Sequence, residues 1–282
     1  MSESEQSSLL CILLDIVSLL QQEESIEKIY GALLLFCNSY LLMHRKNRVI
    51  ILLTTSDDVK IIYPPTSSNS NLSSTYHELS VTVASQIVAI SKEEKQKMTN
   101  VKHPSNSTGN YLANGLSKSL CIINRQIQLS KFLPRVLIMQ FDKDRVVDYN
   151  SFMNSIFNAQ KLEILVDALV VSKYDSHILQ QACFLTGGLY LRHRDEDDIL
   201  QILTMHFLLD DKVRKLFNQP LQKTVDFKAS CHCHRSPVEY AYMCSVCLTL
   251  ICEDADVCPV CSSPSRRVAA NRAPFKIDAF KT

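Results

Sequence analysis

Cysteine is distributed unevenly along this chain of 282 residues, and no other feature of the sequence constrains its folding as strongly. Of the eleven cysteines, seven fall between residues 231 and 261, and the other four are spread over the rest of the chain. The seven are Cys231, Cys233, Cys244, Cys247, Cys252, Cys258 and Cys261. A short segment with few large apolar side chains cannot bury enough surface to fold alone. The clustering therefore predicts a small module that depends on its cysteines, beside a conventional globular body.

The compartment decides whether such cysteines form disulfides or bind metal. The chain starts with the acidic sequence MSESEQSS, whereas a secretory signal peptide starts with a basic region, and Asp15 interrupts the apolar run that follows. No stretch reaches the roughly 18 uncharged apolar residues expected of a transmembrane helix. We therefore expect a reducing compartment without membrane association, in which the cysteines are metal ligands.

Two Cys-x-x-Cys pairs, Cys244 with Cys247 and Cys258 with Cys261, are separated by ten residues. This spacing is typical of two loops that together hold one tetrahedral Zn²⁺ through four thiolates. A single pair could equally be a redox dithiol. Because two pairs occur at this spacing, with three more cysteines nearby, the sequence predicts a structural zinc site.

The remaining clustered residues leave two interpretations open. Cys231, Cys233 and Cys252, together with His234 or His232, could complete a second site of four ligands and make a RING-like pair of zinc ions. The set that we expect in that case is Cys231, Cys233, His234 and Cys252. In the alternative interpretation, Cys252 packs as a hydrophobic residue and the Cys-His-Cys-His run is only an entry loop.

Apolar patterns typical of strands and of helices alternate over the first 220 residues or so. Strands are expected at 9–17, 49–53, 59–63, 136–141, 163–171 and 189–192. Helices are expected at 26–44, 76–90, 111–129, 149–160, 176–184 and 197–209. This alternation predicts a doubly wound α/β domain with a mostly parallel sheet covered on both faces. The second and third strands are expected to form a hairpin at its edge.

Changes of composition divide the chain into segments. We expect the α/β domain at 1–220, with polar surface loops inserted near 64–75 and 91–110, the zinc module at 228–262 and a basic tail at 263–282. The four cysteines outside the cluster fall in apolar runs and are expected to be small core residues. They are Cys11, Cys37, Cys121 and Cys183.

The end of the first strand is where a ligand site is expected in an open α/β sheet. A metal-dependent von Willebrand A domain carries Asp-x-Ser-x-Ser at this point, which supplies oxygen ligands to Mg²⁺. Here Asp15 and Ser18 are present, but Val17 and Leu19 occupy the positions two and four after the aspartate. Neither apolar side chain can bind a metal, so we expect this site to be defective.

Other signals of chemistry are missing from the sequence. With five glycines, the chain has no glycine-rich phosphate loop, and it has no Gly-x-Ser-x-Gly or His-Glu-x-x-His motif. Asp142 and Asp144 follow a later strand and could add oxygen ligands, but acidic residues in such a turn are usually solvated or cap a helix. The sequence therefore predicts that this protein is not an enzyme.

Three stretches resemble one known family. They are NSFMNSIFNAQKLEILVDALV (150–170), LQQACFLTGGLYL (179–191) and the module, with CHCHR, YMCSVCLTLIC and CPVC in this order. This combination resembles the smaller von Willebrand A-like, zinc-binding subunit of the general transcription and DNA-repair factor TFIIH. The resemblance runs from Leu9 to about Cys261 and so covers both the α/β domain and the module.

The resemblance implies a non-catalytic subunit of the TFIIH core complex in the nucleus, acting in RNA polymerase II transcription initiation and nucleotide excision repair. It also implies a partner, the second subunit with an A-like domain and zinc modules, with which it supports the helicase subunits. The net charge of +1 argues against strong binding of nucleic acid, so contact with DNA is expected to be indirect or weak. Two other functions remain open, a RING-like ubiquitin ligase and direct nucleic-acid binding through the zinc module.

Overall fold

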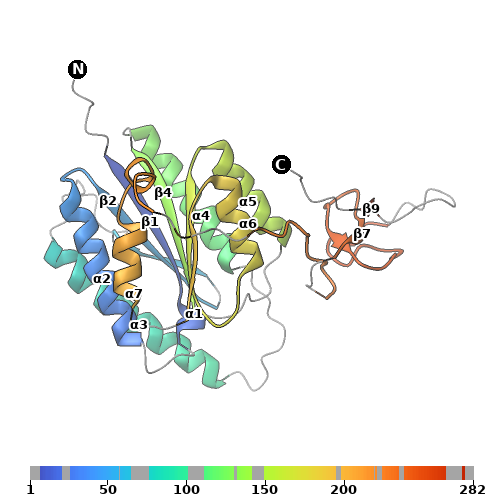
Figure 1. Ribbon diagram of the computed structural model, residues 1–282. Coiled ribbons are helices and arrows are strands. Elements are labelled where there is room, and N and C mark those ends of the chain that lie inside the picture. Colours follow the sequence, from blue (N-terminus) through green and yellow to red (C-terminus); the bar gives the residue numbers. More distant parts are fainter. Residues whose placement is uncertain are drawn as a thin grey trace.

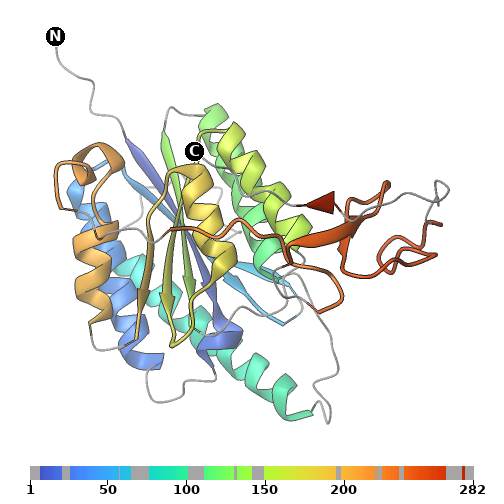
Figure 2. The same ribbon diagram turned by 45° about the vertical axis from the view of Figure 1, so that its right-hand side comes forward.

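The computed structural model shows an α/β domain followed by a small cysteine-rich module (Figure 1). It describes residues 7–20, 26–56, 58–64, 76–100, 111–129, 132–141, 149–194, 198–218, 220, 224–234, 238–264 and 275–276. In both ribbon views the module projects from one side of the domain (Figures 1 and 2).

The domain is built on a sheet of six strands in the order β3-β2-β1-β4-β5-β6. The strands are β1 (Ser8–Asp15), β2 (Arg48–Thr54), β3 (Val59–Tyr63), β4 (Leu133–Gln140), β5 (Leu165–Val171) and β6 (Tyr190–His193). All neighbours are parallel except β2 and β3, which form the predicted antiparallel edge hairpin. The doubly wound α/β fold is therefore as predicted.

Helices cover both faces of this sheet (Figures 1 and 2). On one face lie α2 (Ile26–Met43), α3 (Tyr76–Asn100) and α7 (Ile199–Ile202), and on the other lie α4 (Tyr111–Leu129), α5 (Tyr149–Lys161) and α6 (His177–Thr186). Successive residues of β1 point to opposite faces, so Ile12 and Leu14 pack with α2 while Leu13 packs with α4 and α5. A two-sided core of this kind explains the nearly continuous apolar run of the central strand.

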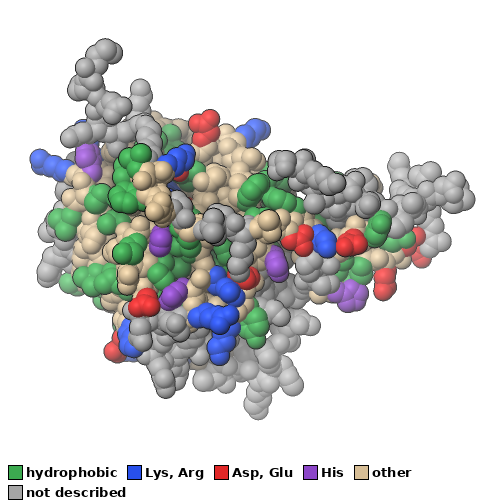
Figure 3. Space-filling view, in the orientation of Figure 1, with side chains coloured by type: hydrophobic (Ala, Val, Ile, Leu, Met, Phe, Trp, Pro, Cys, Tyr) green, Lys and Arg blue, Asp and Glu red, His purple; other side chains and the backbone are tan. Residues whose placement is uncertain are grey.

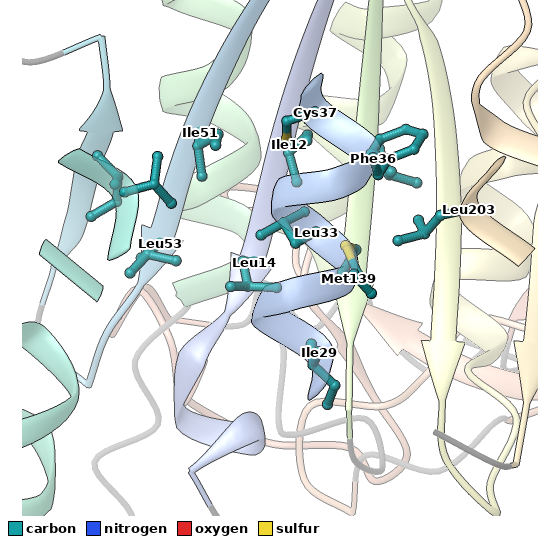
Figure 4. Close-up of a cluster of buried hydrophobic side chains, with 14 of the residues drawn as sticks. Ile12, Leu14, Ile29, Leu33, Phe36, Cys37, Ile51, Leu53, Met139 and Leu203 are labelled. Carbon is teal, nitrogen blue, oxygen red and sulfur yellow. The ribbon is translucent and has the colours of Figure 1, made fainter. Parts of the chain in front are cut away.

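Helix α2 shows how the first core forms. Ile29, Leu33 and Phe36 recur at three and four residues and point from one side of the helix toward Leu14 and Met139 of the sheet (Figure 4). By length and composition alone α2 could cross a membrane. Its position on the sheet accounts for that composition, because the apolar stripe is buried in the domain core.

Two sequence predictions are wrong. Residues 91–100 are not a loop but the last part of α3, in which the fully buried Glu94 accepts a hydrogen bond from the Ser56 backbone N–H (3.1 Å). This contact holds the polar end of the helix against the loop after β2. Cys121 is exposed on α4 rather than in the core, whereas Cys11, Cys37 and Cys183 are buried as predicted.

Other predicted segments differ in extent. The first strand ends at Asp15, whose Oδ1 accepts the Val17 N–H (3.1 Å) at the start of the short helix α1 (Ile16–Leu19). The expected helix at 197–209 is divided into α7 and a π-helical turn, η2 (Leu203–Phe207). Residues 65–75 and 101–110 of the two expected insertions lie outside the described residues.

A buried ion network that the sequence did not reveal joins the end of the domain to the sheet. Asp167 of β5 is fully buried, and Arg214 of α8 (Asp211–Arg214) donates two hydrogen bonds of 2.9 Å to its carboxylate. Arg135 of β4 lies 3.7 Å from the same carboxylate and donates to the carbonyls of Phe207 and Leu209 (both 2.7 Å). Burial lowers the pKa of Arg214, but the hydrogen bonds and charge of Asp167 outweigh it and raise the pKa above its ordinary value.

We predict that Arg214→Ala lowers the free energy of unfolding by roughly 3–5 kcal/mol, because a buried carboxylate loses its main partner. The matched control is Lys215→Ala, which removes an exposed ion pair with Asp211 and should cost under about 1 kcal/mol. Urea unfolding followed by circular dichroism measures both. Equal stability of the two variants would contradict the prediction.

The turn after α6 brings two glycines against β5. Gly187 ends the helix in the left-handed conformation (φ 75°), and the Gly188 N–H donates to the Cys183 carbonyl (2.8 Å). A Cβ atom on Gly188 would lie only 2.0 Å from the Val166 carbonyl oxygen. The backbone of Gly188 therefore packs directly against the backbone of β5, with no room for a side chain.

We predict that Gly188→Ala destabilises the domain by about 2 kcal/mol or more, because the clash is with backbone that cannot move aside. Gly31 offers the control, since a Cβ atom there would meet nothing within 4 Å. Gly31→Ala, inside α2, should instead stabilise by about 0.5–1 kcal/mol. Thermal unfolding that fails to separate the two variants would argue against this packing.

The module contains a second sheet, in the order β8-β7-β9. Its strands are β7 (Tyr240–Met243), β8 (Leu250–Ile251) and β9 (Phe275–Lys276), so two residues of the expected basic tail form a strand beside β7. The connecting segment is tied to α6, where the Gln181 side-chain amide donates to the Asp226 carbonyl (2.6 Å) and Phe184 packs edge-on against Phe227. Asn150 at the start of α5 donates to the Leu248 carbonyl of the module (3.1 Å).

Candidate metal centre

The hairpin of β7 and β8 positions the first Cys-x-x-Cys pair. Its connection is closed by hydrogen bonds from the Cys244 N–H to the Thr249 carbonyl (2.9 Å) and from the Leu248 N–H to the Cys244 carbonyl (3.0 Å). Leu248 takes the left-handed conformation (φ 60°), which turns the chain back directly after Cys247. Both cysteines of the pair therefore lie on one tight loop.

The second pair forms a loop of the same construction. The Ser262 N–H donates to the Cys258 carbonyl (3.0 Å), the Cys258 N–H donates to the Ser263 carbonyl (2.9 Å), and Ser262 is left-handed (φ 56°). In both loops, therefore, the residue after the second cysteine makes the reversal. Two loops with one geometry are what the repeated spacing predicts.

The two loops bring four sulfur atoms together. The Sγ atoms of Cys244, Cys247, Cys258 and Cys261 all lie within 4.8 Å of one another. The separation is 3.7 Å between Cys244 and Cys261 and 3.6 Å between Cys247 and Cys258. A tetrahedron with metal–sulfur bonds of about 2.3 Å has edges of about 3.8 Å. The donor set therefore fits one tetrahedral metal ion, and this cluster can bind a metal.

Polar groups around the sulfurs favour thiolates at one end of the cluster. The Cys247 N–H, the Ser263 hydroxyl and the Val246 N–H lower the pKa of Cys244 to about 5, and Ser263 also lowers the pKa of Cys261. Burial raises the pKa of Cys258 to about 11. A metal ion must displace the proton there, so binding should weaken as the pH falls. The contribution of Ser263 could not be predicted from the sequence, because its hydroxyl comes within 2.9 Å of the Cys261 sulfur only in the folded loop.

A second cluster lies in the same module. The donor atoms of Cys231, His234 and Cys252 also lie within 4.8 Å of one another, and Cys233 lies in the same turn as Cys231 and His234. His232, the other candidate at this position, has an exposed side chain and is not part of the cluster. Cys252 is half-buried, and its sulfur lies beside the donor atoms of Cys231 and His234. In the described part of the chain, these two clusters are the groups of cysteine, histidine and acidic residues that could hold a metal.

At the carboxyl end of β1 the side chains are used for the fold. Val17 and Leu19 are buried (3 and 0% exposed), and an oxygen of Asp15 accepts a backbone N–H of the following turn. The Ser18 side chain and the whole of Asp142 and Asp144 lie outside the described residues. At this edge Val17 and Leu19 are therefore core residues, and Asp15 is bonded within its own turn.

The family model "Transcription factor Tfb4" matches residues 7–262, from β1 to the second Cys-x-x-Cys loop. The chain belongs to the Tfb4 family. Among similar members, "General transcription factor IIH subunit 3" of Dictyostelium discoideum is 40% identical over 149 residues, which are 52% of this chain and 40% of that protein. "General transcription and DNA repair factor IIH subunit TFB4" of Arabidopsis thaliana is 37% identical over 154 residues, 54% of this chain and 51% of that one. The matched part thus spans about half the length of these Tfb4 relatives.

Solved structures agree with the fold of the Tfb4 family. The crystal structure of the TFIIH p34 N-terminal domain superposes with a TM-score of 0.60 at 20% identity, covering 73% of this chain and all of that one. A von Willebrand factor type A protein from Catenulispora acidiphila gives a TM-score of 0.50 at 10% identity, over 70% of this chain and 41% of its own. The α/β domain of this Tfb4 member is therefore von Willebrand A-like.

We predict that Cys258→Ser in this Tfb4 member releases the metal held by the four-cysteine cluster and unfolds the module. The reason is that a segment with so few buried apolar side chains depends on its metal to fold. The α/β domain has its own core and should keep its helical circular dichroism. Metal is measured by elemental analysis of the purified chain.

The control is Cys121→Ser, because Cys121 is exposed on α4, far along the chain from the module. This variant should keep the metal content of the unmodified chain. An unchanged metal content in Cys258→Ser would show that the ligand set is wrong.

Proposed function

We propose that this protein is a non-catalytic structural subunit of the TFIIH core complex, acting in the nucleus in RNA polymerase II transcription initiation and nucleotide excision repair. The observation that carries the proposal is the family match across both the domain and the module. Relatives from several organisms are named as subunits of the general transcription and DNA repair factor IIH. In this role the chain binds a second subunit that has an A-like domain and zinc modules, and the pair supports the helicase subunits.

The metal of the four-cysteine cluster is zinc in this proposal. Four thiolates in a tetrahedral arrangement suit Zn²⁺, and a site with four protein ligands has no open position for a substrate or water. Cys244, Cys247, Cys258 and Cys261 would hold the ion, which would fix the two loops relative to each other. Zinc is thus expected to stabilise the module rather than take part in a reaction.

The surface of the domain supports a protein-binding role. On the face in Figure 3, hydrophobic side chains lie among basic and acidic ones. Large apolar side chains are strongly exposed on α2 and in the segment from η2 onward, including Leu42 (68%), Met205 (62%) and Leu216 (84%). Where such side chains form a continuous patch, another protein typically covers them. The balanced net charge fits contacts with protein better than extensive contact with DNA.

The test is co-expression of the full chain with the A-like, zinc-containing TFIIH subunit of the same organism. We expect the two to elute from a size-exclusion column as one complex, because association should bury the exposed apolar side chains. In an extract depleted of its own subunit, the added chain should restore promoter opening and damage excision. A chain that elutes alone and restores neither activity contradicts the proposal.

The same preparation distinguishes this function from that of a RING-like ubiquitin ligase. The chain is incubated with ubiquitin, its activating enzyme, a panel of conjugating enzymes and ATP. A structural subunit should add no ubiquitin transfer above the reaction without the chain. Transfer that depends on the chain and is lost in Cys258→Ser would replace the structural proposal with the enzymatic one.

A further inference from the structure

The Cys231–His234 turn has the construction of a metal-binding loop. The His234 N–H points at the Cys231 sulfur (3.3 Å), just as the Val246 N–H points at the Cys244 sulfur (3.5 Å) in the first site. The turn is attached to β8 by a hydrogen bond from the His232 N–H to the Leu250 carbonyl (2.8 Å). This bond brings the turn beside Cys252, which follows β8 directly.

Distances within the cluster match a mixed set of sulfur and nitrogen ligands. His234 Nδ1 lies 3.1 Å from the Cys252 sulfur and 3.9 Å from the Cys231 sulfur. A tetrahedral ion with bonds of about 2.3 Å to sulfur and about 2.0–2.1 Å to nitrogen would place such atoms about 3.6 Å apart. The two observed distances lie on either side of this value. The three side chains therefore leave a space of the right size for one ion.

Cys233 is the candidate for the fourth ligand. It lies between Cys231 and His234 in the same turn. Cys231 is buried while Cys233 and His234 are exposed, so the cluster faces solvent on one side and the module on the other. A neutral histidine with three thiolates is a ligand set that zinc commonly adopts in structural sites.

We propose that Cys231, Cys233, His234 and Cys252 bind a second zinc ion, and that the two sites of the module are interleaved. Along the chain, the loop at 231–234 belongs to the second site and the pair at 244 and 247 to the first. Cys252 returns to the second site, and the pair at 258 and 261 returns to the first. Each site is therefore built from two segments, and a ligand of the other site lies between them in the sequence.

The interleaving gives the β7–β8 hairpin two attachments. Cys244 and Cys247 hold its turn in the first site, and Cys252 holds its outgoing strand in the second. Apolar burial in this part is small, with Ala241 and Ile251 among its few buried hydrophobic residues. Two ions that share one hairpin would make the module fold as a single unit, because loss of either ion releases a strand that the other site needs. The proposal concerns the module itself and holds whatever complex the chain joins.

The experiment is the zinc content of the full chain, purified without chelator and measured by elemental analysis against protein concentration. The expected result is two equivalents of zinc per chain. His234→Ala should retain one equivalent at most. His232→Ala is the matched control, because it changes the neighbouring histidine, which is exposed and outside the cluster, and it should retain two equivalents.

One equivalent in the unmodified chain overturns the proposal, and so do two equivalents in His234→Ala. A loss of zinc in His232→Ala overturns the assignment of His234 as the ligand. Metal content is independent of partner binding, so failure here is distinguishable from failure of the proposed TFIIH role, which is tested by complex formation. The His232→Ala control keeps the result interpretable, because two equivalents retained there show that replacing a histidine in this turn does not by itself unfold the module.

Discussion

Burial of the central strands on both faces is the constraint on which the rest of the domain depends. Residues 8–14 of β1 are buried and pair with a parallel strand on either side. Parallel neighbours require a crossover connection, and burial on both faces requires those crossovers to be divided between the two sides. The positions of α2 and α7 on one face and of α4, α5 and α6 on the other follow from this requirement. The buried charge of Asp167 is compensated within this core by Arg135 and Arg214.

The module cannot be stabilised by a buried apolar core as the α/β domain is. It has too few apolar side chains to form a core, and its sheet consists of one four-residue strand between two strands of two residues. In place of an apolar core, the module has four cysteine thiols that lie close together. The fold of the domain is thus encoded in long apolar runs, and that of the module in the spacing of a few cysteines. The chain therefore contains two kinds of folding unit, one with a large apolar core and one in which cysteines converge.

The sequence alone allowed some features of both units to be predicted and not others. The strand runs and the Cys-x-x-Cys spacing are local patterns, so the order of elements and the first four-cysteine cluster could be predicted. Contacts between distant residues could not. Glu94 extends α3 because its carboxylate is held by a backbone group 38 residues earlier, and Asp167 meets Arg214 from 47 residues away. Ser263 acts on Cys244 only because the two loops converge. No spacing rule connects such pairs, and the sequence therefore left the second cluster open as well.

The way the two units are joined bears on how a partner can bind. The described contacts between them come from α5 and α6, through Asn150, Gln181 and Phe184. The module is therefore attached on the side of the sheet opposite to α2 and α7, and it leaves that helix layer uncovered. Leu42 and Met205 are exposed in this layer, while the carboxyl end of β1, where related domains can hold a metal, has its Asp15 bonded to its own backbone. The exposed apolar side chains of this helix layer are therefore where the proposed partner subunit would bind, since the module does not cover them.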